Sequence, residues 1–411
     1  MVMPHIAPAT AMPATRSWWP VAAVMGAVAW GGNEFTPLLV MYRAGGLDAV
    51  TVNALLGAYV LGIVPALLLG GPLSDRYGRR PLLLPAAPVA ALGSVILALG
   101  AGAPAVLGVG RVLSGVALGL VMAVGTTWVT ELAAQAGDAA AGARRASLAL
   151  TAGFLVGAGV ASALAQWAPW PAHLAYGVHV LLAAVTAVWV LRVPETCRTA
   201  GARVGRLRDD LRVPAVAHPR FLRVVVPVAP WVFGCVGAAY AVLPGLLAAH
   251  AGTVPVAFAG LMTVLTLGCG IGIQVVARRI DTHRSARASV VAMSLIITGL
   301  GLGALAAHTL DIVVGLLAAA VLGAGYGLAL VAGLSEVARI AGPRHLAGLT
   351  AVYCSVAYLG FFVPMVLAWL ARTWTYAQMF GVGLLIAAVC LAVVGAAWRA
   401  HLPALAAGAA D

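Results

Sequence analysis

Two charged side chains fall inside long apolar stretches, where one could bind and release a proton and the other could tune it. Glu34 lies in the segment Trp30–Pro37, and Arg111 opens the segment Arg111–Gly119. A charge inside a membrane-spanning segment is costly and usually functional. A nearby guanidinium favours the ionised carboxylate, whereas removal from water favours the neutral acid. We therefore predict that Glu34 is a proton site and that Arg111 tunes it. The alternative is a permanent buried pair that only fixes helix packing.

A second group of charged residues lies in and around a polar loop, Gly71–Leu83, and could form a gate. Its two glycines permit a tight turn. Asp75 can face the positive N-terminal end of a helix near Leu346–Leu349. An arginine of the Arg79–Arg80 pair can form a charge-assisted pair with Glu131. The spacing predicts a cytoplasmic gate made of Gly71, Asp75, Arg76, Gly78, Arg79, Arg80 and Glu131.

The second half of the chain contains a weaker copy of this pattern. The segment Arg278–Arg284 keeps an aspartate, Asp281, between arginines but has no glycine. Glu336, in Ser335–Gly342, corresponds to the glutamate of Thr130–Gly137 and lies at nearly the same spacing from its aspartate. We predict that Asp281 and Glu336 belong to a second gate and that the chain arose by duplication.

Membrane helices must position these residues. The chain has 411 residues, of which 63% are hydrophobic and 9% charged, against about 25% charged in soluble domains. This composition excludes a cytosolic enzyme, a nucleic-acid binder and a disordered scaffold. The apolar runs lack the alternation of barrel strands, so the spans are helical. We predict twelve spans near 18–41, 50–70, 81–101, 105–130, 146–167, 172–192, 223–248, 256–277, 289–307, 311–334, 347–371 and 376–398.

A polar stretch divides the spans into six and six. The predicted units are an N-terminal six-helix bundle at 1–193, a cytoplasmic linker at 194–222 and a C-terminal bundle at 223–411. Two pseudo-symmetric bundles with a substrate site between them are a transporter architecture. Part of the linker, 203–213, forms either a short helix on the inner leaflet or a solvated connection.

The positions of the arginines predict the orientation. All 24 residues counted as lysine or arginine are arginines. With the N-terminus inside, all but Arg43, Arg372 and the intramembrane Arg111 lie on the cytoplasmic side. The net charge of +12 is thus explained without nucleic acid. We predict a multi-pass protein of the inner cell membrane with both termini cytoplasmic, and a short tail over the first 17 residues.

Polar and aromatic residues within the spans are candidates for a substrate site. A nearly uncharged aromatic cavity with one carboxylate suits lipophilic or cationic compounds. For each tyrosine the alternative is an ordinary packing residue with a satisfied hydroxyl, and His179 and Gln166 are weaker candidates. The predicted substrate-binding residues are Asn33, Tyr59, Tyr240, Tyr326, Tyr353 and Tyr358.

The loop Gly71–Leu83 closely resembles the signature loop of the major facilitator superfamily, and the layout of twelve spans extends this resemblance over the whole chain. Arg111–Gly119 looks like a fourth-helix motif found in many proton-coupled members. Gly153–Ser162 partly resembles the antiporter motif, with Ala158 in place of its proline and other residues in place of its closing glycines. The resemblance implies a secondary transporter that works by alternating access, similar to the proton-coupled drug efflux branch.

We therefore expect proton-coupled efflux, by antiport, of small lipophilic or cationic compounds. The alternative is proton-coupled uptake of a small organic solute by symport. A polytopic membrane enzyme is a third reading, but it would need clustered acidic, histidine or serine residues, and the nine histidines are dispersed. We expect no enzyme activity, no cofactor beyond the proton gradient, no metal site, and a monomer whose partners are its substrate, protons and the lipid bilayer.

Overall fold

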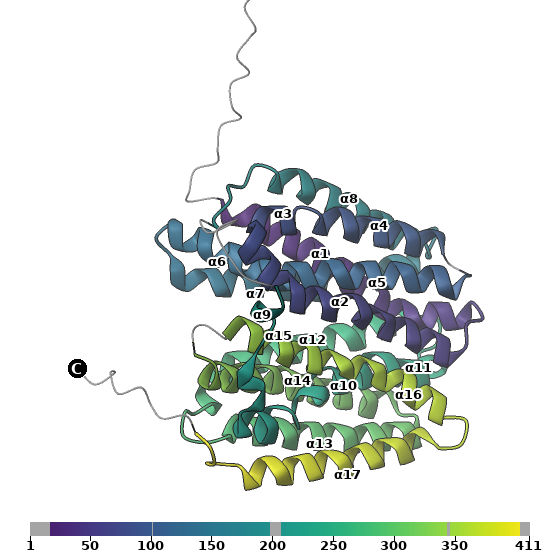
Figure 1. The fold of residues 1–411 in the computed structure, drawn as a ribbon. Helices are drawn as coiled ribbons and strands as arrows, with labels where there is room; N and C mark the ends of the chain where they lie inside the picture. Colours follow the sequence, from purple (N-terminus) through teal and green to yellow (C-terminus); the bar gives the residue numbers. More distant parts are fainter. Residues whose placement is uncertain (1–16, 101, 198–206, 343–345, 403–411) are drawn as a thin grey trace, which may run out of the picture.

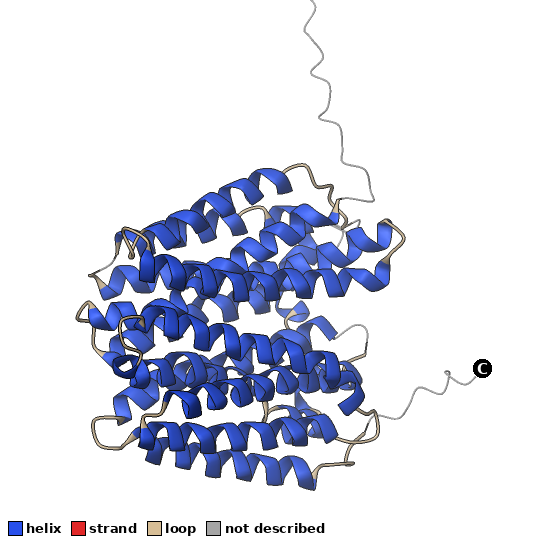
Figure 2. Ribbon diagram, turned by 180° about the vertical axis from the view of Figure 1, so that it is seen from behind, coloured by secondary structure: helices blue, strands red, loops and turns tan. Residues whose placement is uncertain are grey.

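The computed structural model describes residues 17–100, 102–197, 207–342 and 346–402. Within these ranges the chain consists of helices joined by short turns, with no strand (Figure 2). The predicted cytoplasmic tail lies outside the described residues except for its last residue, and so does the first part of the predicted linker helix at 203–213. The described end of that segment forms one short helix, α9 (Leu207–Asp210).

The first half of the chain crosses the bundle six times. Asp48 begins the second crossing as an N-cap, because its carboxylate accepts the backbone N–H groups of Val50 and Thr51 at 2.9 and 3.1 Å. The fourth crossing passes through a wide π-helical turn, η2. The elements are α1 (Trp18–Ala44), α2 (Ala49–Tyr77), α3 (Arg79–Leu83) with α4 (Ala86–Leu99), α5 (Pro104–Leu120) with η2 (Val121–Gly125) and α6 (Thr126–Gln135), α7 (Ala139–Trp167), and α8 (Leu174–Val190).

The second half also crosses six times. Thr375 and Gln378 form a capping box at the start of the last helix, each side chain bonding the other's backbone N–H. After the short η3 (Pro214–Ala217), the elements are η4 (Phe221–Val225), α10 (Ala229–Gly237), η5 (Ala238–Val242), α11 (Leu243–Leu247) and η6 (Ala248–His250), then α12 (Pro255–Ile280), α13 (Arg287–Thr309), α14 (Ile312–Ile340), α15 (Leu346–Tyr358) with η7 (Leu359–Phe362) and α16 (Val363–Leu370), and α17 (Tyr376–Ala396).

Twelve crossings result. Among the described residues, ten helical stretches are long and apolar enough to cross a membrane. The other two crossings are α1, whose 27 residues include the polar Asn33, Glu34 and Thr36, and α8, which has 17 residues. The predicted fold, an all-α integral membrane protein with twelve helices, is confirmed.

The helices form two halves that meet along the middle of the bundle. α1–α8 lie together on one side and α10–α17 on the other (Figure 1). In the first half α1 packs against α7 and α2 against α5, and in the second α14 packs against α12 and α13. α7 contacts α12, and α2 contacts α15 and α16, so these helices make the interface between the halves.

The two ends of the bundle differ in charge. We call one end the basic face; α2 and α6 terminate there and α7 begins there. The other end, the opposite face, is where α1 and α7 terminate and α2 begins. The basic face includes Arg76, Arg79, Arg80, Arg220 and Arg339, whereas Arg43 and Arg372 lie at the opposite face.

Glycines let the backbones of two helix pairs approach closely. A Cβ added at Gly115 of α5 would lie 2.1 Å from the carbonyl oxygen of Tyr59 in α2. In the second half, a Cβ at Gly327 of α14 would lie 2.0 Å from the carbonyl oxygen of Gly270 in α12. Small residues permit this kind of contact in membranes. The equivalent α2–α5 and α12–α14 pairs are therefore built in the same way.

Candidate functional site

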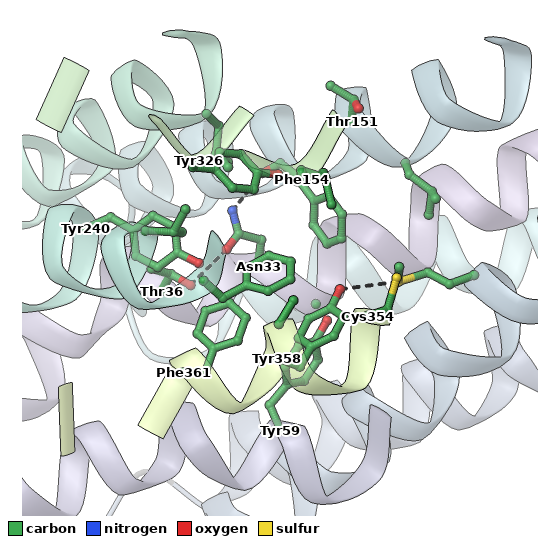
Figure 3. Close-up of a pocket in the computed structure, with 18 of the residues that line it drawn as sticks. Asn33, Thr36, Tyr59, Thr151, Phe154, Tyr240, Tyr326, Cys354, Tyr358 and Phe361 are labelled. Atoms are coloured by element: carbon green, nitrogen blue, oxygen red, sulfur yellow. Dashed lines mark hydrogen bonds between the residues drawn. The ribbon is translucent and has the colours of Figure 1, made fainter. Parts of the chain in front are cut away.

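A cavity of about 150 Å³ lies between the two halves (Figure 3). Its walls come from α1, α2, α5, η2 and α7 on one side and from α10, η5, α12, α14, α15 and η7 on the other. Sites for drug-sized ligands enclose about 300–1,000 Å³. In this conformation the cavity therefore has room for a small solute only.

The cavity opens toward the basic face. Asn33, Thr36 and Tyr240, which line its far end, are all buried. Ser147, which lines it near the start of α7, is exposed, and Gln274 near the end of α12 is half-buried. Because exposure increases along the lining toward the basic face, solvent reaches the cavity from that side.

The opposite face is closed by contacts between the halves. Gln166, at the end of α7, donates to the carbonyl oxygen of Thr253 at 3.0 Å. Its own oxygen accepts the N–H groups of Val256 and Ala257, at 3.0 and 3.2 Å, in the first turn of α12. Arg43 adds a bond to the carbonyl oxygen of Gly245 at 3.3 Å. A side chain of one half thus caps a helix of the other.

Aromatic rings form much of the cavity wall. The Phe233 ring stacks on Tyr358 and Phe361, with centroids 4.2 and 4.9 Å apart. Tyr358 also donates a hydrogen bond to the sulfur of Met122 across the two halves, at 3.3 Å (Figure 3). Polarity alone did not single out Phe233, Phe361 or Met122, because apolar residues look the same in a core and in a cavity.

Five of the six residues predicted for the substrate site line this cavity: Asn33, Tyr59, Tyr240, Tyr326 and Tyr358. Tyr353 does not. Its hydroxyl donates to the carbonyl oxygens of Ala329 and Leu330 in α14, and its ring is fully buried against that helix. The alternative of an ordinary packing residue holds for this tyrosine, since its hydroxyl is satisfied within the second half.

Arg111 is the only charged residue among the described residues that line the cavity. Its Nε and Nη1 atoms donate to the carbonyl oxygens of Leu55 and Gly32, at 3.4 and 3.3 Å. The guanidinium also lies over the rings of Phe35 and Tyr59, 4.7 and 4.4 Å from their centroids. These neighbours fix its position but do not neutralise its charge.

Glu34 has different neighbours from those we predicted. It is fully buried, and its Oε1 accepts the hydroxyl of Ser94 from α4 at 2.8 Å. The Nδ1 atom of His179, on α8, lies 3.6 Å from the same oxygen. Glu34 and Arg111 form no direct ion pair. Adjacent residues of a helix point in different directions, so Asn33 lines the cavity while Glu34 faces α4 and α8.

The predicted gate loop is held together by Arg79. Its guanidinium pairs with Asp75 at 2.5 Å and with Glu131 at 2.9 Å. Arg80 does not take this role, because its side chain donates to the carbonyl oxygen of Leu191. Arg76 pairs with Asp210 of α9 at 2.7 Å.

One of the two glycines of the gate loop departs from our expectation. Gly71 lies inside α2, where an added Cβ would meet no atom within 4 Å, so it makes no tight turn. Gly78 does make the turn, with φ of 104°. A Cβ there would also lie 2.6 Å from the carboxylate of Glu195. Only Gly78 has a conformation that requires glycine.

Glu195 is a part of this network that the sequence did not reveal. Its carboxylate accepts backbone N–H bonds from Arg79 and Arg80 at 3.0 and 2.8 Å, and also from Thr196 and Cys197. Burial raises the pKa of Glu195, but these four bonds together outweigh burial and hold the pKa below its usual range. Thr196 in turn donates a hydrogen bond to Glu131. The carboxylate therefore stays ionised and fastens the start of the linker to the loop.

In the second half, Asp281 and Glu336 are joined through Arg339. Arg339 pairs with Asp281 at 2.5 Å and with Glu336 at 2.9 Å. Arg220, which is fully buried, pairs with the other side of Glu336 at 2.5 Å. The bridging arginine thus comes from the helix that holds the glutamate, whereas in the first half it comes from the loop.

Twelve membrane helices in two halves, around a cavity open at one face and closed at the other, define a membrane transporter. The chain belongs to the major facilitator superfamily, because the sequence model described as Major Facilitator Superfamily matches residues 19–363.

A 165-residue stretch of the chain is 32% identical to a gallate transporter of Pseudomonas putida. It covers 38% of this chain and 34% of that protein, so the match spans about a third of the length of this curated relative.

Solved structures show the same fold. A mutant form of the nucleoside transporter NupG superposes with a TM-score of 0.74 at 13% sequence identity, covering 93% of this chain and 99% of that one. A D-xylose-proton symporter superposes with a TM-score of 0.63 at 20% identity, covering 90% and 96%. At these identities the likeness concerns the fold alone.

Proposed function

We propose that the protein is a secondary transporter that takes up a small aromatic carboxylate together with protons. The observation that carries this proposal is the composition of the cavity. Arg111 is the only charged side chain among its described lining residues, and stacked aromatic rings surround the remaining space. A guanidinium recognises a carboxylate through paired N–H bonds, and aromatic rings pack on an aromatic ligand.

This substrate class differs from the cationic or lipophilic compounds that we expected from the sequence. That expectation placed the carboxylate of Glu34 in the cavity. Glu34 instead faces Ser94 and His179, and its side chain is fully buried. A cavity whose only described charge is positive attracts anions rather than cations. The partial match to a gallate transporter supports an aromatic acid as the ligand.

Glu34 remains the proposed proton site, with Arg111 close enough to influence its charge. The proposed cycle is alternating access between the two halves. With the basic face on the cytoplasmic side, as the arginine distribution favours, this conformation is open to the cytoplasm. Opening the other side would break the Gln166 contacts, while the Arg79 and Arg339 networks would hold each half's loop in place.

Efflux by antiport is the second candidate. The segment Gly153–Ser162 of α7, which partly resembles the antiporter motif, lies where three helices meet. A Cβ at Gly157 would lie 2.7 Å from Trp30 of α1, and a Cβ at Gly260 of α12 would lie 1.9 Å from the hydroxyl of Ser162. The observation that favours antiport is the place of this partial motif, at the tightly packed contact between the two halves.

Flux in proteoliposomes tests both candidates. Under an imposed pH gradient, we expect gallate to accumulate on the alkaline side and a protonophore to abolish the accumulation. Glu34→Gln should lose this accumulation while retaining exchange of gallate down its own gradient. Asp311→Asn, which removes a carboxylate that only caps α14, serves as the control. Movement of a cationic dye against the proton flow, with no gallate transport, would establish antiport and refute the first proposal.

A further inference from the structure

Glu34, Ser94 and His179 form a continuous chain of hydrogen-bonding atoms. The Ser94 hydroxyl lies 2.8 Å from Glu34 Oε1 and 2.7 Å from His179 Nδ1. On the other side of the ring, His179 Nε2 lies 3.0 Å from the carbonyl oxygen of Ala27. All three side chains have no exposed surface. They come from α1, α4 and α8, which all belong to the first half.

The number of hydrogens in this chain is fixed by its partners. A carbonyl oxygen only accepts, so His179 Nε2 must have a hydrogen. The two contacts of Ser94 then need two hydrogens, and the hydroxyl supplies one. The second must come from Glu34 as a neutral acid or from His179 as an imidazolium. With an ionised glutamate and a neutral histidine, one of the two short contacts would join two lone pairs.

A second observation indicates that the chain holds this proton. The other carboxylate oxygen, Glu34 Oε2, is buried and accepts no well-formed hydrogen bond among the described residues, and the unpaired indole N–H of Trp30, one turn earlier in α1, interacts with the carboxylate only weakly. Removing an ionised carboxylate from water without a well-formed hydrogen bond to one oxygen costs much free energy, whereas removing the neutral acid costs much less. The buried site thus favours the form with the extra proton.

Other ionisable groups around the site are few. Arg111 of α5 lies on the cavity side, with its guanidinium over Tyr59 of α2. Tyr42 of α1 and Tyr176 of α8 bond each other through hydroxyls 2.8 Å apart. Arg111 favours the ionised glutamate, so moving its charge nearer or further alters how firmly the proton is held. Apart from the three residues themselves, no described acidic or basic side chain forms a hydrogen bond with Glu34 or Ser94.

We propose that Glu34, Ser94 and His179 together form one binding site for a single proton, with Ser94 as the switch between two arrangements. In one, Glu34 Oε1–H donates to Ser94 and the Ser94 hydroxyl donates to His179 Nδ1. In the other, His179 Nδ1–H donates to Ser94 and Ser94 donates to the ionised glutamate. To pass from the first arrangement to the second, the Ser94 hydroxyl hydrogen transfers to His179 Nδ1 while the Glu34 proton transfers to Ser94 Oγ, so that in net effect one proton moves from Glu34 to His179.

This inference rests on the proposed proton coupling through Glu34, and it adds a function for α4 and α8. Both arrangements have no net charge, so the site is loaded in the conformation described here. A proton leaves only when movement of α1 against α4 or α8 separates the partners and admits water. Ser94 then connects the two groups that can hold the proton, and loss of Ser94 or His179 changes the pH at which the site loads.

Two substitutions test the site in opposite directions. In His179→Gln the Ser94 hydroxyl is free to donate to an ionised Glu34, so the pH midpoint of gallate uptake should fall by about one unit or more. In Ser94→Ala the ionised glutamate loses its donor, so the midpoint should rise by a similar amount. A merely structural role would lower the rate in both variants without moving the midpoints in opposite directions.

Matched controls remove a similar group elsewhere. His308→Gln replaces an exposed histidine at the end of α13. Thr186→Val removes a buried hydroxyl of α8 that bonds only its own helix. Both should keep the wild-type midpoint. One result would refute the three-residue site while the proposed function stands. In that result the wild type is proton-driven and Glu34→Gln is uncoupled, but both Ser94→Ala and His179→Gln keep the wild-type midpoint.

Infrared difference spectra of the purified protein give a readout that does not need transport. We expect a protonated carboxyl band that titrates together with an imidazole band and vanishes in Glu34→Gln. His179→Gln and Ser94→Ala should move the titration of the carboxyl band, again in opposite directions. If the carboxyl band titrates at the wild-type pH in both variants, the inference is overturned, whether or not the wild type is proton-driven.

Discussion

Arg111 is held so that its charge faces the cavity while its fixed contacts stay within the first half. Two backbone carbonyls, of Leu55 and Gly32, and two aromatic rings hold it in place. The Nη2 group donates to no atom in the described part of the chain. Carbonyl dipoles and ring faces stabilise a cation without neutralising it, so a ligand anion is its natural partner.

Arg111→Lys tests this recognition. Lysine keeps the charge but lacks the planar fork that bonds a carboxylate and several neighbours at once. Loss of a hydrogen bond to a charged group costs about 1.5–3 kcal/mol, so we expect gallate to bind about tenfold or more weakly, as measured by titration calorimetry on purified protein. Arg372→Lys, at an exposed position of the opposite face, should bind as wild type does. Equal affinities for gallate in the wild type, Arg111→Lys and Arg372→Lys would contradict the assignment of Arg111 as the residue that binds the carboxylate.

At the scale of helices, glycine contacts determine how closely each half is assembled. Gly62 and Gly115 bring α2 and α5 into backbone contact, and Gly323 and Gly327 do the same for α12 and α14. Without a hydrophobic force between helices in lipid, such packing is a main source of association. Both pairs contribute residues to the cavity wall, so their close packing fixes where those residues lie.

Gly115→Ala should destabilise the fold. Its Cβ would approach the Tyr59 carbonyl oxygen to 2.1 Å, where backbone must move. Overpacking of this kind costs about 1–3 kcal/mol, so we expect a lower midpoint of thermal unfolding in detergent. Gly108→Ala, on the same helix, would place its Cβ 3.8 Å from the nearest atom, a Leu55 methyl group. It should unfold at or slightly above the wild-type temperature, and equal losses in the two variants would rule out the packing argument.

At the scale of the whole molecule, the cavity opens to the basic face because the halves touch at the opposite face. Gln166 makes three hydrogen bonds to the start of α12. Each net bond contributes about 1 kcal/mol, a strength that suits a contact made and broken in every cycle. Together with the close approach of Ser162 to Gly260, this contact biases the molecule toward the conformation described here.

Gln166→Ala should shift the population toward a state open at the opposite face. Spin labels at His173 and Thr309, in a variant without the native cysteines, would report a larger share of long distances between the halves. Gln378→Ala is the matched control, because Gln378 also caps a helix but does so within its own half. A distance distribution that stays the same in Gln166→Ala would show that other contacts hold this face closed.

The sequence predicted features that depend on local spacing. The twelve crossings followed from apolar runs, and the pairing of one arginine of Arg79–Arg80 with Glu131 followed from the loop pattern, although only the structure shows that it is Arg79. It did not predict features that depend on how distant helices turn toward each other. Ser94 is an ordinary residue of an apolar run until α4 packs against α1, and the direction of Glu34 away from Arg111 is a matter of helix rotation. Likewise, Tyr353 and Tyr358 lie on the same helix, and only the packing of that helix places Tyr358 in the cavity and Tyr353 against α14.

Because α8 is short, the thickness of the surrounding bilayer should affect how this helix sits in the membrane. Its 17 residues span about 26 Å at 1.5 Å per residue, less than the roughly 30 Å of a typical hydrocarbon core. Such a mismatch is relieved by local thinning of the bilayer or by a shift of the helix. Trp170, just before α8, and Trp189, in its last turn, are exposed, as interfacial anchors are. Because α8 contains His179, a shift of this helix in a thicker bilayer would move the buried histidine relative to Ser94. The length of the lipid acyl chains should therefore change the rate of transport.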